Sequence, residues 1–161
     1  MPKNRRKNFN ESDIQRLLYF YTAKQNKKLW AHNIYLFNWE SDFIAIDDKG
    51  KIFEYEIKLS LTDFKADFRK RKHTIFGRAM SEKTTPYAPN YFYFVCPAGV
   101  VSPKQVPSYA GLIYVYPNKE LKVVKKPKQL HSVKRGQTPK VLTNIAKSLS
   151  HRWYSKSRTK K

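Results

Sequence analysis

The sequence predicts a layered α/β domain in which helices flank a mixed central sheet. Within residues 42–58 apolar and polar side chains alternate with the two-residue period of half-buried strands. Residues 91–96 form a nearly continuous apolar run, which is typical of a central strand covered on both faces. Apolar residues recur at helical spacing in residues 10–24 and again after Pro139. Helices interspersed with strands in this way indicate layered α/β architecture.

The first half of the chain predicts a helix, three strands and a second helix. Asn10 and Asp13 resemble a capping pair at the start of the first helix, and Ser60 with Asp63 resembles a capping box before the second. The predicted elements are helices over residues 10–24 and 62–72, a strand over residues 34–38, and the two arms of a hairpin over residues 42–58. In the second helix, Phe64 and Phe68 are expected to face the sheet.

The second half predicts a loop, strands and a long final helix. Residues 73–89 contain a histidine, a glycine and two prolines, and these favour a loop. Ser102 and Pro103 supply a cap and a first-turn proline for a short helix. The remaining predicted elements are strands over residues 91–96, 111–116 and 121–125, and a helix opened by Thr138 and Pro139 in which Val141, Ile145, Leu149 and Trp153 recur every fourth residue.

Composition and charge limit the classes of function. The 161 residues suffice for one domain, expected over residues 9–154, with a basic arm at 1–8 and a basic tail at 155–161. The net charge of +21 favours a polyanionic partner. There is no apolar stretch long enough for a membrane span and no apolar signal core. The single cysteine, Cys96, excludes an internal disulfide, which fits a reducing, cytoplasmic setting. With a polyanionic partner, association with the nucleoid is expected.

Cationic runs predict where a polyanion binds. Cations that displace counterions from phosphates are the usual source of affinity for nucleic acids, so DNA is the expected partner and a membrane is not. His73 is one candidate for contact with phosphate; its alternative is a histidine that is simply solvated. The candidates for contact with phosphates are Lys3, Arg5, Arg6 and Lys7 in the arm, Arg69, Lys70, Arg71, Lys72 and His73 after the second helix, and Lys156, Arg158, Lys160 and Lys161 in the tail.

The register of the predicted hairpin decides whether two acidic residues meet. If residues 48–50 form a three-residue loop, Asp42 falls opposite Glu56, and directly opposed residues have Cβ atoms about 4.5–5.5 Å apart. Lys58 then lies about 6.6 Å further along the same face. A two-residue loop places Ser41 opposite Glu56 instead. The first register is preferred because it uses Gly50 where positive φ is required.

Two carboxylates and a lysine are the groups that a Mg²⁺-dependent phosphodiester hydrolase needs. Mg²⁺ prefers oxygen ligands and keeps several waters. It lowers the pKa of a bound water and offsets charge that develops on the phosphate. Lys58, with a pKa lowered near a metal, is a candidate to orient the hydroxide. The plain alternative is that Glu56 and Lys58 alternate on the wet face of an edge strand, and Glu54 is expected to be a solvated neighbour.

The spacing of Asp42 and Glu56-Ile-Lys58 after one helix resembles the PD-(D/E)xK nuclease superfamily. The strings EIKLSLTDFKADFR, NYFYFVCPAG and VPSYAGLIYV more narrowly resemble MmcB-like DNA repair proteins, over roughly residues 9–125. The resemblance implies a restriction-endonuclease-like αβββαβ core with an added C-terminal helix. It also implies that Asp42, Glu56 and the Ile57 carbonyl ligate Mg²⁺, for which Mn²⁺ can substitute. Lys58 then positions or deprotonates the attacking water. The proline that usually precedes the aspartate is Ser41 here.

Glu11 matches an additional acidic metal ligand that several members of the superfamily carry on the first helix. The plain alternative for Glu11 is an acidic residue that stabilises the start of that helix. The resulting prediction is a metal-dependent DNA endonuclease of repair, recombination or phage replication. The alternatives are a nuclease-like protein that binds DNA without cleaving it and, third, a basic RNA-binding or ribosomal-type protein. A homodimer is possible, since enzymes of this fold that cut branched DNA commonly work as dimers.

Overall fold

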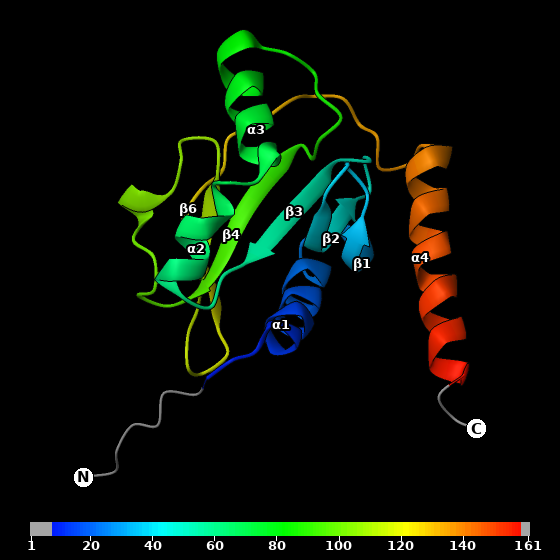
Figure 1. The fold of residues 1–161 in the computed structure, drawn as a ribbon, viewed down its shortest axis with the longest axis horizontal. Coiled ribbons are helices and arrows are strands. Elements are labelled where there is room, and N and C mark those ends of the chain that lie inside the picture. Colours follow the sequence, from blue (N-terminus) through cyan, green and yellow to red (C-terminus); the bar gives the residue numbers. More distant parts are fainter. Residues whose placement is uncertain (1–7, 159–161) are drawn as a thin grey trace.

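Six strands form one mixed sheet in the computed structural model, which describes residues 8–158 (Figure 1). The strands lie in sequence order, with antiparallel pairing except for β3 with β4 and β4 with β5, which are parallel. Parallel neighbours need a crossover connection, and this role falls to the helical segments that follow β3 and β4. The strands are β1 (Lys27–Tyr35), β2 (Glu40–Asp47), β3 (Ile52–Ile57), β4 (Tyr91–Pro97), β5 (Gly111–Val115) and β6 (Leu121–Lys125).

Helices cover both faces of this sheet, which confirms the predicted class of fold. Helix α1 packs on one face, and α2 and α3 pack on the other. Helix α4 packs beside β1 and β2 at one edge (Figure 1). None of the helices within residues 8–158 is long and apolar enough to cross a bilayer. The helices are α1 (Glu11–Ala23), α2 (Leu61–Asp67), α3 (Arg71–Glu82), the 3₁₀ turn η1 (Pro103–Gln105) and α4 (Pro139–Arg158).

The predicted caps of the first two helices are present. The Asn10 side chain accepts a hydrogen bond from the Asp13 backbone N–H at 2.8 Å, and the Asp13 carboxylate accepts one from the Asn10 N–H at 3.0 Å. Ser60 Oγ accepts from the Asp63 N–H at 3.1 Å at the start of α2. Each cap satisfies a backbone donor that has no partner inside the helix.

The β2–β3 hairpin has the preferred register. Phe43 pairs with Tyr55 and Ile46 with Ile52, and the Asp47 N–H donates to the Lys51 carbonyl at 3.1 Å. The loop therefore consists of residues 48–50. Gly50 adopts a φ of +84°, where a Cβ is disfavoured. The three-residue loop predicted from this glycine is confirmed.

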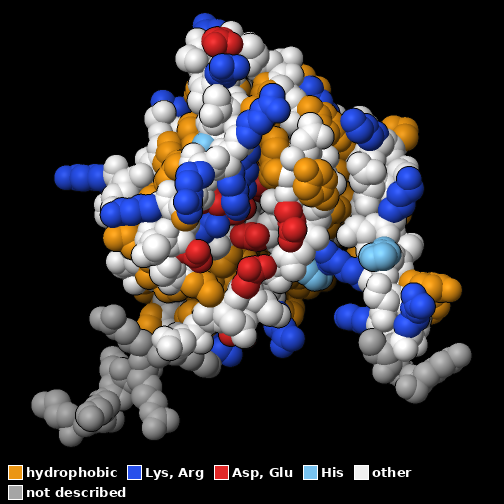
Figure 2. Space-filling model, viewed as in Figure 1, with side chains coloured by type: hydrophobic (Ala, Val, Ile, Leu, Met, Phe, Trp, Pro, Cys, Tyr) orange, Lys and Arg blue, Asp and Glu red, His pale blue; other side chains and the backbone are white. Residues whose placement is uncertain are grey.

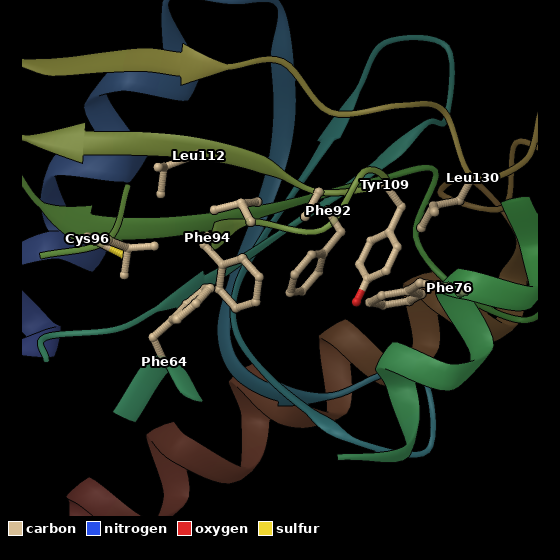
Figure 3. Packing of buried hydrophobic residues seen from close by; sticks show 12 residues of the cluster. Phe64, Phe76, Phe92, Phe94, Cys96, Tyr109, Leu112 and Leu130 are labelled. Atoms are coloured by element: carbon tan, nitrogen blue, oxygen red, sulfur yellow. The ribbon is translucent and has the colours of Figure 1, made fainter. Parts of the chain in front are cut away.

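Aromatic side chains fill the core beneath α2 and α3. Phe92 and Phe94 project from the same side of β4, and their rings lie 5.0 Å apart (Figure 3). Phe64 of α2 packs 4.8 Å from Phe94, and Phe76 of α3 packs 4.9 Å from Phe92. Edge and tilted contacts of this kind add to the free energy of burying the rings. Phe64 faces the sheet as predicted, and so does the Phe68 ring, which lies 5.7 Å from Phe94 although the residue is 36% exposed.

Several predicted boundaries were wrong. Strand β1 begins at Lys27 rather than at residue 34. The helix expected over 62–72 breaks at Phe68 and restarts as α3, which occupies most of the segment expected to be a loop, 73–89. Helix α4 continues through Arg158, so residues 155–158 are helical rather than part of a separate tail. Of the predicted arm and tail, residues 1–7 and 159–161 lie outside the described part of the chain.

A strap, residues 126–138, runs from β6 at one edge of the sheet to α4 at the other (Figure 1). The buried Asn90 side chain donates to the carbonyls of His131 and Val133 in the strap and accepts from the Ile52 N–H. Gly136 donates to the Gly50 carbonyl at 2.8 Å. A Cβ on Gly136 would lie 2.3 Å from an Ile46 methyl group, so the close approach of strap and hairpin requires glycine.

Candidate functional site

The acid pair that the hairpin register predicts lies where β2 begins and β3 ends. The observed pairing of Phe43 with Tyr55, continued by one residue, sets Asp42 opposite Glu56. Asp42 Oδ2 accepts a hydrogen bond from the Ile57 backbone N–H at 2.7 Å. Asp42 is half-buried and Glu56 is fully buried. The hairpin thus brings together the two carboxylates expected from the sequence.

Three lysine ammonium groups surround the Glu56 carboxylate. Lys58 Nζ lies 3.0 Å and Lys70 Nζ 2.6 Å from Oε1, and Lys72 Nζ lies 2.6 Å from Oε2. Lys58 and Lys72 are buried, whereas the Lys70 side chain is 46% exposed. Both oxygens of Glu56 therefore already have cationic partners supplied by the chain itself.

Asp67 is a member of this site that the sequence prediction missed. Its Oδ1 lies 2.9 Å from Lys58 Nζ and 2.7 Å from Lys70 Nζ. Its Oδ2 lies 2.6 Å from His73 Nε2, and His73 Nδ1 lies 2.7 Å from the Tyr109 hydroxyl. A relay of hydrogen-bonding groups thus runs from Tyr109 to Lys58. The available signal was spacing, because Asp67 follows Phe64 by three residues and shares its sheet-facing side of α2.

Glu54 is fully buried, so the expectation that it would be a solvated neighbour was wrong. Its carboxylate accepts from Trp39 Nε1 at 3.0 Å and lies 3.2 Å from Lys72 Nζ. Glu54 alternates with Glu56 and Lys58 on the face that α2 and α3 cover. A carboxylate buried there needs such partners, since an unpaired buried charge is very costly.

The environment shifts the pKa values of Asp42 and Lys58. Burial, followed by the neighbouring Glu56 carboxylate, raises the pKa of Asp42 to about 7. Burial lowers the pKa of Lys58, but the carboxylates of Glu56 and Asp67 outweigh it, and the net pKa is raised. The lowered pKa expected for Lys58 refers to a site that holds a metal; without a metal the neighbouring carboxylates keep its pKa raised. At neutral pH Lys58 is a cation, which positions or polarises a neighbouring group rather than removing its proton.

Glu11 lies at the start of α1, close enough to Asp42 for its charge to raise the pKa of that carboxyl. Gln15 connects the two, since its side-chain amide donates to Glu11 Oε1 at 3.2 Å and to the Asp42 carbonyl at 2.9 Å. The helix start therefore adds a third acidic group to the neighbourhood of the acid pair.

The acidic side chains of the site offer the oxygen donors that Mg²⁺ requires. Figure 2 shows Asp and Glu side chains gathered near the centre of one face, with Lys and Arg side chains around them. Within residues 8–158 no three His, Cys, Asp or Glu side chains are grouped closely enough to hold a metal ion. Proteins usually hold Mg²⁺ through one or two carboxylates and several waters. Asp42 and Glu56 fit that smaller set, and their mutual repulsion is what a cation would relieve.

The predicted phosphate-binding residues are distributed differently from expectation. Lys72 and His73 are buried against carboxylates, so their assignment to an exposed cationic run was wrong. The physical reason is that α3 turns both side chains toward the sheet. Arg69 and Arg71 are exposed, and Lys70 is partly exposed beside Glu56. Exposed positions on α4 carry Lys156 and Arg158, whereas Lys3, Arg5, Arg6, Lys7, Lys160 and Lys161 lie outside the described residues.

Comparisons with known proteins bear on the fold. No protein-family model matches the chain, and no curated protein matches it. Among solved structures, the chain is similar to the SPO1766 protein of unknown function from Silicibacter pomeroyi, with a TM-score of 0.58 and 16% sequence identity. The match covers 82% of this chain and 80% of that one. At this identity the likeness extends to the fold alone.

Proposed function

We propose that the protein is a Mg²⁺-dependent DNA endonuclease whose site is built on Asp42, Glu56 and Lys58. The observation that carries the proposal is the register that sets Asp42 opposite Glu56, in a place where burial, and then the Glu56 carboxylate, raise the pKa of Asp42 to about 7. Lysine ammonium groups contact Glu56, whereas Asp42 accepts a hydrogen bond only from a backbone N–H among the contacts found for its carboxylate, so the repulsion between the two carboxylates falls mainly on Asp42. The repulsion costs less when a divalent ion is bound.

Each residue has a distinct role in this proposal. Asp42 and Glu56 would hold Mg²⁺, or Mn²⁺ in its place, and Ile57 fixes the orientation of the Asp42 carboxylate through its N–H. The ion supplies Lewis acidity toward a phosphate oxygen and a water of lowered pKa. Lys58, held by Glu56 and Asp67, presents a fixed positive charge to the phosphate or to the attacking water. Lys70, the more exposed of the two lysines that contact Glu56 Oε1, would have to release that oxygen for an ion to bind it.

The second candidate function is DNA binding without cleavage. The three ammonium groups around Glu56 favour it, because they neutralise that carboxylate without a metal. Under this alternative the cluster is a structural ion-pair network. The cationic surface then accounts for the affinity for DNA.

Cleavage assays separate the two functions. The protein is incubated with supercoiled plasmid, single-stranded DNA and a branched junction, with Mg²⁺, with Mn²⁺ and with EDTA. The endonuclease proposal predicts cleavage that requires a divalent ion and that Asp42→Ala and Glu56→Ala abolish while DNA binding persists. Lys104→Ala removes an exposed cation on the turn η1, outside the proposed site, and serves as the control variant. Equal cleavage by Glu56→Ala and wild type would reject the assignment.

A further inference from the structure

A groove of about 690 Å³ opens between α1 and α4, across the edge strand β1. We propose that this groove holds an unpaired segment of DNA, with a base on its aromatic wall and the adjoining phosphate near Arg16. The choice of DNA rests on the proposed function, whereas the groove itself is a separate observation. Binding in the groove and cleavage at the acid pair can therefore be tested independently.

The wall formed by α1 offers a surface for stacking. Tyr19 and Phe20 line the groove and are 43% and 58% exposed. Tyr19 packs edge-on against Phe20 at 5.3 Å and against Trp30 of β1 at 4.9 Å. These contacts hold the rings in place, so little conformational entropy remains to be lost on binding. Proteins that bind single strands use such rings as platforms, because every base has a stacking face.

The charges along the groove suit an anion. Arg16 and His32 line it, and the lining residues that the structure describes include no carboxylate. Arg152 of α4 donates hydrogen bonds to the carbonyls of His32 and Asn33, which fixes its guanidinium beside the groove. Burial, and then the charges of Arg152 and Lys156, lower the pKa of His32. A phosphate placed here would offset this excess of positive charge.

The groove reaches the strand that carries Asp42. Gln15 lines the groove and donates to the Asp42 carbonyl at 2.9 Å, and Phe43, the next residue of β2, also lines it. In Figure 2 cationic and histidine side chains lie between the acidic side chains and α4. A strand with a base on Tyr19 or Phe20 would therefore lie beside the start of β2, next to Asp42 in the chain.

An unpaired strand suits this surface better than a duplex. The bases of a duplex are stacked on each other and cannot lie flat on Phe20, whereas splayed bases can. DNA also lacks the 2′-hydroxyl that can attack the neighbouring phosphate of RNA, so its cleavage depends on an activated water. The proposed substrate is thus DNA with an unpaired region, such as a flap, a gap or a branch point.

Binding measured in EDTA tests the groove without any dependence on cleavage. The probe is a fluorescein-labelled single-stranded oligodeoxynucleotide of mixed sequence, compared with the corresponding blunt duplex and the RNA of the same sequence. Phe20→Ala is expected to weaken single-strand binding by about tenfold, from the typical effect of one stacked base. Arg16→Ala is expected to weaken it as well and to reduce its salt dependence, because it removes a contact to phosphate. Phe20→Trp, which keeps a ring, and Lys104→Ala, which removes a cation outside the groove, should bind as wild type does.

Several outcomes would overturn the inference. If Phe20→Ala bound the single strand as tightly as wild type does, the proposed stacking of a base on Phe20 would be wrong. Tighter binding of the RNA or the duplex than of single-stranded DNA would reject the assigned ligand. A change of oligomeric state in Phe20→Ala, seen by sedimentation without any change in DNA binding, would make the groove a contact between copies of the chain. A wild-type protein that binds the single strand but cleaves no DNA with either metal would reject the proposed function and leave the binding result intact.

Discussion

Lys72→Met tests whether the buried charges beside Glu56 act as one unit. The Lys72 side chain is fully buried, and its ammonium lies 3.2 Å from Glu54 and 2.6 Å from Glu56. Methionine has nearly the same shape, so the change removes the charge with little loss of packing. Removing one partner of a buried ion pair typically costs about 3–5 kcal/mol, because the remaining charge is left uncompensated. We expect a loss of free energy of unfolding of that size at pH 7.

Lys70→Met is the matched control. Lys70 also lies 2.6 Å from Glu56, but its side chain is 46% exposed, so solvent screening limits the expected loss to about 1 kcal/mol or less. The assay is urea denaturation followed by circular dichroism. Glu54→Gln added to Lys72→Met should recover part of the loss, since it removes one uncompensated carboxylate. Equal losses for Lys70→Met and Lys72→Met, or no recovery in the double variant, would refute the reasoning.

Two further predictions concern Asp42 and the neighbouring Glu11. The pKa of Asp42 is about 7 in the folded protein and near 4 when unfolded, so the folded state binds the extra proton and loses stability as the pH rises from 4 to 7. Asp42→Asn should therefore match wild type near pH 4 and exceed it by about 4 kcal/mol at pH 8, measured by urea denaturation. A difference that does not depend on pH would contradict this. Glu11→Gln should raise the Mg²⁺ concentration needed for half-maximal cleavage while thermal stability stays unchanged, and an unaltered requirement would return Glu11 to a role in starting α1.

The sequence predicted the hairpin well because local rules decide it. Gly50 requires positive φ, and this sets the loop length and hence the pairing of Asp42 with Glu56. The rule involves only residues within the hairpin. The capping of α1 by Asn10 and Asp13 was predictable for the same reason.

Residues whose role depends on remote partners were not predictable. His73 began a segment expected to be a loop, whereas it lies in α3, between Asp67 and Tyr109. Lys72 belongs to the same helix and is buried because Glu54 and Glu56, on β3, lie beneath it. Tertiary contacts of this kind override local propensity. No periodicity within residues 69–89 indicates which cations meet carboxylates on another element.

The strap ties the geometry of the groove to that of the acid pair. Residues 126–138 lead into α4, and Gln137 at their end donates to the Asp48 carbonyl at the hairpin tip at 2.9 Å. Helix α4 itself buries only Val141 and Ile145 among its described residues, so its position depends heavily on this attachment. The turn that sets the carboxylates opposite each other also anchors the far wall of the groove. An insertion in residues 48–50 would therefore disturb both the acid pair and the α4 wall of the groove, so the geometry of one cannot change without that of the other.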